Sequence, residues 1–306
     1  MLRKAVDLEV LARLEVHADL HGQPCVPLEQ LVCRHDSRTI VALRVCIVLA
    51  LLVVPSARGA TSILAIGDFG VGGERQRVLG TAVRDYESRR SADLLLTLGD
   101  NDYTRGVSFA TNWTSTFGWL SAARVGVAGT LGNHDVEFAR GRYQFDLLRM
   151  PGAYYVRRAK DVELIVLDSN AITTAQTRWL TRTLAKRSPR TRIVALHHPP
   201  YTCGGHLGSG AVQRVWVPLF ERYGVRLVLS GHDHNYQRFE RNGVTYVVHG
   251  GGGAGLYKLR ACPRAYPARL AARVGHGFLH LAVEPDGVLV QVIDLKGQSI
   301  DRFRVT

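Results

Sequence analysis

The sequence GDFG at residues 67–70 is the first of five short blocks that determine the fold expected for this chain. The other four blocks are GDNDY at 99–103, GNHD at 132–135, VALH at 194–197 and GHDH at 231–234. Each block follows an apolar run typical of a buried strand, and each carries oxygen or nitrogen atoms that bind hard or borderline metal ions. Because open α/β folds place their sites at the carboxyl ends of strands, we expect these side chains to meet at one sheet edge.

Strand-like and helix-like segments alternate through most of the chain. The apolar, strand-like runs are residues 62–66, 93–98, 124–131, 164–167, 192–196 and 225–229. The helix-like segments between them are residues 76–89, 136–148, 174–187 and 211–223. Apolar strands bounded by glycine and separated by helices predict α/β structure in which helices cover the sheets. After Gly255 the pattern changes, and strand-like runs at 278–283, 287–294 and 299–305, joined by EPDG and LKGQ turns, predict an antiparallel meander.

Composition limits the possible classes of protein. The 306 residues are 46% hydrophobic, which is enough for one large domain, and we expect a single catalytic domain over residues 60–306. Lys and Arg exceed Asp and Glu by 39 − 26 = 13, but this excess is dispersed along the chain. A nucleic-acid-binding protein more often carries a basic tract or a reading motif, so nucleic acid is not expected as the main partner. A dispersed positive charge instead favours attraction of phosphorylated substrates.

Residues 45–54, VCIVLALLVV, form a short apolar core with arginines before it and small residues after it. This order is typical of a secretory signal peptide. Since a membrane-spanning helix needs roughly 20 apolar residues, no stable transmembrane anchor is expected. We therefore expect residues 1–59 to be a leader that is cleaved near Gly59, and the mature protein to be secreted or extracytoplasmic. A buried core strand is the less favoured alternative, because no turn precedes so long a run.

Residues 1–40 fit this interpretation poorly, because signal peptides lie near the start of a chain. In one explanation the true start lies downstream, around Val32 or Val41, so that residues 1–40 are not part of the real protein. In the other, these residues are a long cytosolic leader on an anchored protein. The sequence leaves both explanations open.

Cysteine usage agrees with export. Loss of the leader would remove three of the five cysteines and leave Cys203 and Cys262, an even number. We expect these two to form a disulfide that ties together two loops. The chain has no Cys-x-x-Cys pair, so a zinc site built from thiolates is not supported.

In order, spacing and identity, the five blocks resemble the calcineurin-like metallophosphoesterases, and specifically their purple acid phosphatase branch, over roughly residues 61–255. The resemblance implies an α/β fold, a four-layer α/β/β/α sandwich, here with a C-terminal antiparallel strand meander. It also implies a binuclear metal centre bridged by Asp100. The remaining implied metal ligands are Asp68, Tyr103 and His234 in the first site and Asn133, His197 and His232 in the second.

The first block departs from the commonest pattern of the superfamily. Most metallophosphoesterases carry a histidine two places after the first aspartate, where this chain has Gly70. As in the purple branch, the resemblance implies that Tyr103 supplies the missing ligand. Tyrosine has an unperturbed pKa of about 10 and binds as the anion only beside a strongly polarising cation. We therefore expect Fe(III) at the site of Asp68, Asp100, Tyr103 and His234, and a divalent ion (Zn, Mn or Fe(II)) at the other.

Three further histidines lie outside the ligand set. The resemblance implies that His134 and His206 contact the phosphoryl group. His198 is assigned a supporting or structural role, because neighbouring residues in an extended segment point to opposite sides. A slip of one residue would exchange it with His197. Asp102 and Asp135 would either support the ligands or face solvent.

The function implied by this resemblance is that of a secreted acid phosphatase. It would hydrolyse phosphate monoesters, on small molecules or phosphoproteins, by attack of metal-bound hydroxide. Two alternatives stay open: a phosphodiesterase or nucleotidase of the same superfamily, and a non-catalytic phosphate-binding protein on the same fold. Taken singly, Asp68, Asp100 and Asn133 could merely cap helices, but the agreement of all seven positions in order favours the metal centre.

Overall fold

The structure is a computed structural model that describes residues 60–306. The expected signal peptide core at 45–54 and its cleavage position near Gly59 lie outside the described residues. Within residues 60–306, no helix is both long enough and apolar enough to cross a membrane.

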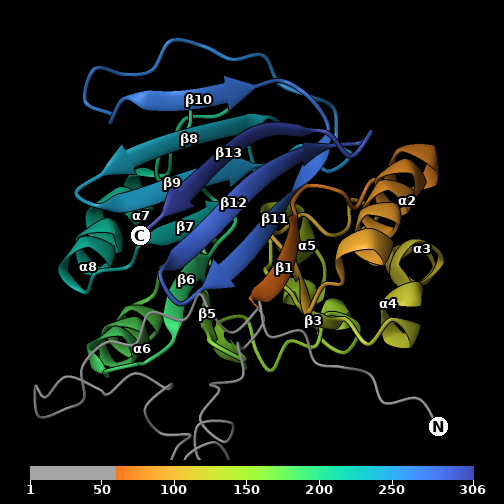
Figure 1. Cartoon of the computed structure of the whole chain (residues 1–306), viewed down its shortest axis with the longest axis horizontal. Helices are drawn as coiled ribbons and strands as arrows, with labels where there is room; N and C mark the ends of the chain where they lie inside the picture. Colours follow the sequence, from red (N-terminus) through yellow and green to blue (C-terminus); the bar gives the residue numbers. More distant parts are fainter. Residues whose placement is uncertain (1–59) are drawn as a thin grey trace, which may run out of the picture. The chain divides into compact units, whose positions relative to one another are not determined.

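Two sheets form the centre of this part of the chain (Figure 1). The first sheet has the strand order β13 (Ser299–Val305), β12 (Gly287–Asp294), β11 (Gly277–Glu284), β1 (Thr61–Ile66), β2 (Leu94–Thr97) and β3 (Gly126–Ala128). The second has the order β10 (Arg269–Arg273), β8 (Tyr236–Arg241), β9 (Val244–His249), β7 (Leu227–Ser230), β6 (Thr191–Ala195), β5 (Val162–Val166) and β4 (Tyr155–Ala159).

Residues along the central strands of the second sheet alternate between two hydrophobic clusters. In β5, Leu164 and Val166 belong to the cluster shared with the first sheet, whereas Ile165 belongs to the cluster that contains helical residues such as Leu180 and Phe220. Successive residues of a strand face opposite sides of the sheet. The sheet is therefore buried on both faces, which explains why its strands are continuous apolar runs in the sequence.

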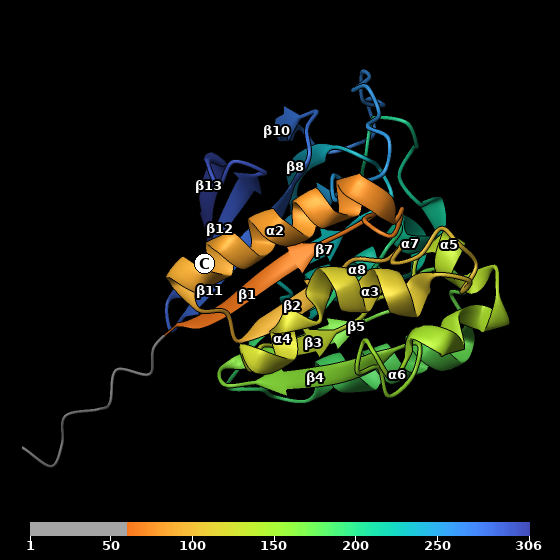
Figure 2. The ribbon, with the colours of Figure 1, turned by 90° about the vertical axis from the view of Figure 1, so that its right-hand side faces the viewer.

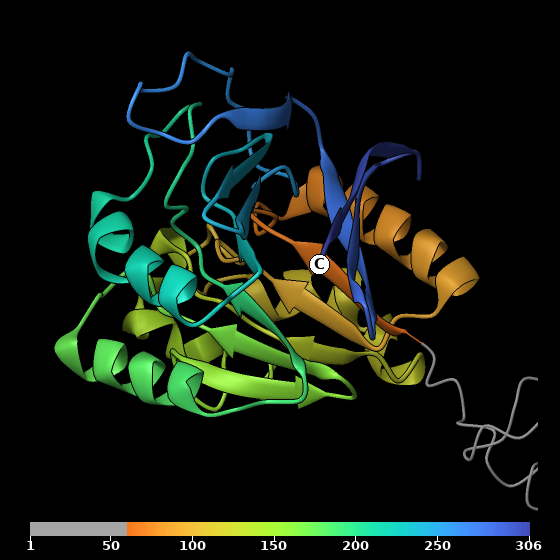
Figure 3. The same cartoon turned by 60° about the vertical axis from the view of Figure 1, so that its left-hand side comes forward.

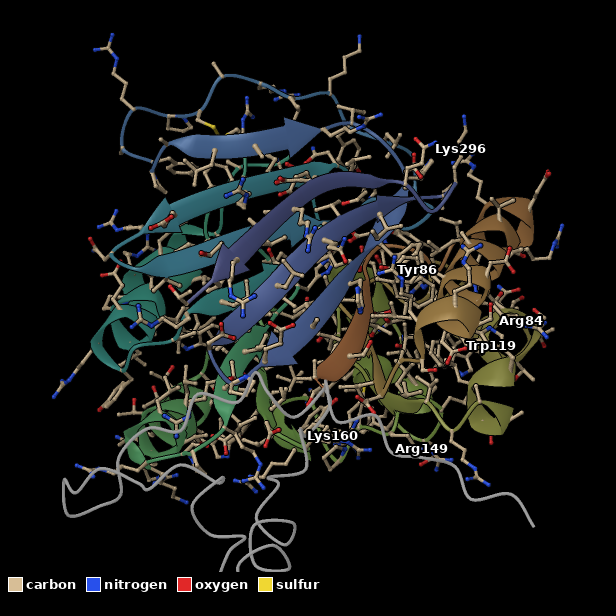
Figure 4. The ribbon with its side chains drawn as sticks, viewed as in Figure 1. Arg84, Tyr86, Trp119, Arg149, Lys160 and Lys296 are labelled. Atoms are coloured by element: carbon tan, nitrogen blue, oxygen red, sulfur yellow. A yellow bond between two sulfur atoms is a disulfide. The ribbon has the colours of Figure 1, made fainter. Side chains whose placement is uncertain are left out.

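Helices cover the outer faces of both sheets. On the first sheet these are α2 (Gly73–Arg90), α3 (Phe109–Phe117) and α4 (Trp119–Ala122), which Figure 2 shows in front of β1 and β2. On the second they are α6 (Thr174–Ala185), α7 (Gly210–Val215) and α8 (Val217–Arg222), which come forward in Figure 3. Tyr86 of α2, labelled in Figure 4, packs with its ring 5.3 Å from that of Phe278 on β11. The expected four-layer α/β/β/α sandwich is confirmed.

The C-terminal strands extend the first sheet. β11 pairs antiparallel with β12 from Gly277 opposite Asp294 to Glu284 opposite Gly287, and β12 pairs antiparallel with β13. β1 pairs parallel with β2 on one side and antiparallel with β11 on the other. The predicted antiparallel meander is therefore confirmed, and it lies beside the first strand of the α/β unit.

Two predicted elements were wrong in extent. The strand expected over 124–131 contains only the three residues of β3, and the helix expected over 136–148 contains the short α5 (Asn133–Val136) at its start and a 3-10 helix, η3 (Ala139–Gln144). Positive φ angles explain the late start of β3, with 58° at Arg124, and the break in the helix, with 53° at Arg140 and 72° at Gly141. Left-handed backbone fits neither a strand nor a right-handed helix.

Candidate metal centre

Three candidate ligands follow strands, and the backbone of each has a positive φ angle. Asp68 follows β1 with φ of 58°, Asp100 follows β2 with φ of 50°, and His232 follows β7 with φ of 70°. Such angles are uncommon for residues other than glycine, and they turn the chain sharply as it leaves the sheet. The N–H of Asp68 donates to the carbonyl oxygen of Gly99 at 2.9 Å, and the N–H of His232 donates to Asp68 Oδ2 at 2.8 Å. One backbone hydrogen bond and one bond to a carboxylate therefore join these turns to one another.

The first predicted site is a group of four facing donors. The hydroxyl of Tyr103 lies 3.2 Å from Asp100 Oδ2 and 3.4 Å from His234 Nε2. His234 Nε2 lies 3.3 Å from Asp68 Oδ1, while His234 Nδ1 donates to the carbonyl oxygen of Gly255 at 2.7 Å. A carbonyl oxygen only accepts hydrogen bonds, so Nδ1 carries the proton and, in the neutral ring, the lone pair of Nε2 faces the carboxylates.

The second predicted site shares Asp100 with the first. His197 Nε2 lies 3.1 Å from Asn133 Oδ1 and 3.5 Å from Asp100 Oδ1, and His197 Nδ1 donates to the carbonyl oxygen of Leu98 at 2.8 Å. The ring of His232 is centred 5.0 Å from that of His197. One oxygen of Asp100 therefore faces Tyr103 and the other faces His197, which is the position of a bridging carboxylate.

His198 also lies against this second group. Ligand nitrogens of His197, His198 and His232 lie within 4.8 Å of one another, as do ligand atoms of Asp68, Asp100 and His197. Ser169 Oγ holds His198 Nδ1 at 2.9 Å. His198 is thus a further nitrogen donor at the edge where the structure gathers all seven predicted ligands.

The electrostatics of the centre fit cations. Burial raises the pKa of Asp68 to about 7, and the charge of Asp100 adds to the effect. Burial likewise raises the pKa of Asp100. Burial and neighbouring histidines lower the pKa values of His197 and His232, so these rings are neutral near pH 7. Buried carboxylates are costly alone, and together with the ring nitrogens that they face they are suited to bind metal ions, so the residues present fit two ions.

Gly70 explains how a tyrosine reaches the first site. The N–H of Gly70 donates to the carbonyl oxygen of Asp100 at 3.1 Å, and its carbonyl oxygen accepts from the N–H of Tyr103 at 3.0 Å. A Cβ at this position would lie 2.1 Å from the backbone carbonyl of Asn101. A histidine therefore cannot occupy position 70 while the following turn keeps this path. Burial and the two carboxylates raise the pKa of Tyr103, so its deprotonation needs a strongly polarising cation.

Asp102 and Asp135 are buried and hold the loops of the centre, so the option that they face solvent is wrong. Asp135 accepts hydrogen bonds from the N–H of Gly132 at 2.7 Å, from the N–H of Asp102 at 3.0 Å and from Gln144 Nε2 at 2.7 Å. Asp102 accepts from the hydroxyl of Tyr143 at 2.8 Å. The two carboxylates therefore tie the second sequence block to the third.

His134 lies at the rim of the centre. Its N–H donates to Asp100 Oδ1 at 3.0 Å, and its ring is centred 4.5 Å from that of Tyr103. His134 Nδ1 lies 3.0 Å from Glu137 Oε1, and both side chains are about two-fifths exposed, at 41% and 44%. Glu137 therefore orients the ring. Glu137 was not predicted from the sequence, although its i+3 spacing in a helical turn could have indicated the contact.

His206 reaches the centre from a loop that Asp233 holds. Its ring stacks on that of His232 with centroids 4.2 Å apart and an interplanar angle of 26°. The buried carboxylate of Asp233 accepts from the N–H of Gly205 at 2.8 Å and from the hydroxyl of Thr202. Asp233 was also missed, although the strand period of two places it on the opposite side from the flanking histidines.

Tyr257 is a third residue of the centre that was not predicted from the sequence. Its ring stacks on that of His234, with centroids 4.2 Å apart and an angle of 8°, and its centroid lies 5.3 Å from that of His206. The expected disulfide between Cys203 and Cys262 is present in the structure. It joins the loop of His206 to the segment that follows Tyr257.

The chain matches a known family over more than half of its length. Residues 61–236 match the calcineurin-like phosphoesterase family. The chain belongs to this family. Among the curated relatives of this calcineurin-like phosphoesterase, tartrate-resistant acid phosphatase type 5 of Oryctolagus cuniculus is 25% identical over 83% of this chain and 94% of the relative. Purple acid phosphatase 1 of Ipomoea batatas is 29% identical over 60% of this chain and 44% of the relative.

These relatives place this calcineurin-like phosphoesterase in the purple acid phosphatase branch and support a hydrolase of phosphate esters. Two solved structures share its fold. A purple acid phosphatase, PPD1 from Lupinus luteus seeds, has a TM-score of 0.65 at 18% identity, over 81% of this chain and 54% of that one. GAP50, the anchor in the inner membrane complex of Plasmodium, has a TM-score of 0.68 at 17% identity, over 81% and 89%. At these identities the likeness is one of fold alone.

Proposed function

We propose that this phosphate-ester hydrolase is a secreted acid phosphatase with two metal ions, acting on phosphate monoesters. The observation that carries the proposal is the position of Asp100, whose two oxygens face the two donor groups at 3.2 Å and 3.5 Å. When bound, the pair of ions would supply a hydroxide nucleophile at mildly acidic pH and positive charge for an in-line displacement. Export is proposed from the signal peptide pattern of residues 45–54.

The ligand assignment follows from the two donor groups. We assign Asp68, Asp100, Tyr103 and His234 to Fe(III), and Asp100, Asn133, His197 and His232 to a divalent ion. The phenol of Tyr103 supports a trivalent ion because its pKa is raised by burial and by two carboxylates. The neutral rings of His197 and His232 support a divalent ion at the second site.

His134 and His206 are assigned to the phosphoryl group. His134 stands at the exposed rim beside Tyr103, oriented by Glu137, so its ring can stabilise phosphoryl oxygens or donate a proton to the leaving alkoxide. His206 is held over His232 by the loop that Asp233 fixes. Both rings therefore contact the centre without being needed to hold its ions.

Metal analysis combined with a substrate panel tests this proposal. Purified mature protein should contain two metal ions per chain and hydrolyse phosphate monoesters faster than diesters, with an acidic optimum. His134→Ala should lower kcat by about 10²–10⁴-fold with metal content unchanged, as expected for loss of general acid help. Asp100→Asn should lower the content of both ions. His276→Ala, outside the donor groups, serves as the matched control.

Absence of hydrolysis would contradict the proposal. If metal-loaded protein hydrolyses no phosphate ester between pH 4 and pH 8, the catalytic proposal is wrong and a phosphate-binding role on the same fold takes its place. A preference for diesters would leave the metal centre intact and move the proposal to the phosphodiesterase alternative.

A further inference from the structure

A pocket of about 650 Å³ lies at the other end of β3 from the candidate metal centre. Its walls come from α3 and α4, from β3, from residues 146–149 and from β4. Arg124 and Gly126 lie at the start of β3, whereas Asn133 of the metal centre follows its end. Figure 4 labels Arg149 on this side of the molecule, near α4. None of the seven candidate ligands is among the described residues that line this pocket.

Three arginines give the pocket its charge. Arg124, Arg149 and Arg157 line it together with a single acidic residue, Asp146, among residues 60–306. Within that same range no ion pair involves any of the three guanidinium groups. Arg157 Nη2 lies 3.7 Å from the place where Gly126 would carry a Cβ, so this guanidinium group lies beside the start of β3. The pocket therefore presents unpaired positive charge.

Arg124 and Arg149 both stand where the backbone favours glycine. Their φ angles are 58° and 52°. In each case the N–H of the arginine donates a hydrogen bond to the carbonyl oxygen of the residue three places before it, at 3.1 Å for Arg124 and 3.4 Å for Arg149. The N–H of the residue after each arginine donates to the carbonyl oxygen of the residue five places before that donor, at 2.9 Å in both cases. This is the capping pattern in which the left-handed residue is usually glycine. The same pocket thus receives two guanidinium groups from positions where a side chain is conformationally unfavourable.

We propose that this pocket is a second anion site that binds phosphate, either free inorganic phosphate or the phosphoryl group of an organic phosphate. The planar guanidinium group matches phosphate oxygens in a bidentate manner, and three of them around one volume favour a multiply charged oxyanion. The walls also include Leu147, which is half-buried and would contact an apolar body attached to the phosphoryl group. The proposal does not depend on the chemistry of the metal centre.

Calorimetric titration of metal-loaded protein tests the proposal with two probes. Inorganic phosphate represents the free ion, and phenylphosphonate, which has no ester bond to hydrolyse, represents an organic phosphate. Wild-type protein should bind two molecules of a probe per chain. The double variant Arg124→Gly/Arg149→Gly, and separately Arg157→Gln, should bind one. If the site that the variants remove binds phenylphosphonate more tightly than inorganic phosphate, the site is assigned to organic phosphates. If it binds phenylphosphonate equally or more weakly, it is assigned to the free ion.

The glycine variants are designed to keep the fold, because glycine suits both left-handed positions. Their thermal unfolding midpoint should equal or exceed that of the wild type. The matched control is Arg140→Gly, which removes an exposed arginine of φ 53° outside the pocket and should leave two binding events. Equal stoichiometry in wild type and double variant would overturn the proposal. If the metal centre itself binds no phosphate, the wild type should bind one molecule of the probe and the double variant none. Failure of the second site and failure of the metal centre therefore give different results.

Discussion

Replacement of Asp68 by asparagine should stabilise the metal-free protein while it abolishes metal binding at the first site. Without a cation, burial raises the pKa of Asp68 from 3.8 to about 7, with the nearby charge of Asp100 adding to the effect. The ionised carboxylate is therefore unfavourable in the folded metal-free protein. In the wild type the N–H of His232 donates to Asp68 Oδ2 at 2.8 Å. Asparagine keeps the shape of the side chain and an oxygen that can accept this hydrogen bond.

The magnitude follows from the two pKa values. They differ by about 3, and since each pKa unit corresponds to about 1.36 kcal/mol, the penalty is about 4 kcal/mol. Because the folded-state pKa lies above the unfolded value, the folded state binds this proton more tightly. The contribution of Asp68 to stability is therefore fully present below pH 3.8 and is lost as the pH rises through 7.

Urea denaturation in the presence of a chelator measures this effect at pH 5 and pH 8. At pH 8 Asp68→Asn should exceed the wild type in unfolding free energy by about 4 kcal/mol, and at pH 5 by less than half of that. Added metal ions should stabilise the wild type more than the variant, which keeps only the second site. Asp85→Asn, at an exposed carboxyl group of α2, is the control. A metal-free variant no more stable than the wild type at pH 8 would refute the reasoning.

Four further predictions concern the centre, its loops and the leader. Tyr103→Phe should remove the visible absorption of the iron-loaded protein; a colourless wild type with stoichiometric iron would contradict the ligand assignment. Asp233→Asn should lower kcat/KM at least tenfold without loss of metal, because it loosens the loop held at 2.8 Å; unchanged kinetics would count against this role. Replacing Cys203 and Cys262 by serine should lower the unfolding free energy by about 4 kcal/mol, given the separation of 59 residues; equal urea midpoints would disprove it. The intact mass of secreted protein should match a chain that begins near Ala60, and full-length protein recovered from the cytosol would argue against export.

The sequence predicted the central strands β5, β6 and β7 because they are buried on both faces. Their residues, such as 164–167 and 192–196, are apolar without interruption, so little else could explain them. The edge strands β4 and β10 were not predicted. They carry arginines and are only partly buried, so no apolar run marks them, and their pairing depends on neighbours distant in sequence. Left-handed residues such as Arg124 shortened other elements, and no sequence pattern for arginine indicates such an angle.

The candidate site was predictable where a residue follows a strand directly. Asp68, Asp100 and His232 could be placed at one edge from the strand order alone, although their roles as ligands stay predictions. Tyr257 could not be placed, because it reaches His234 through a loop whose path depends on tertiary contacts. Glu137 could have been found from helical spacing once His134 was singled out.

Gly70 also limits how the metal centre could change during evolution. Any side chain at this position would meet the backbone of the turn that delivers Tyr103, at 2.1 Å from the carbonyl of Asn101. A lineage that gained histidine at 70 first would lose the turn before it gained a ligand. A lineage that lost tyrosine first would have an incomplete centre. On the proposed ligand assignment, directed evolution from this chain should exchange tyrosine for histidine only when both positions and the intervening turn vary together.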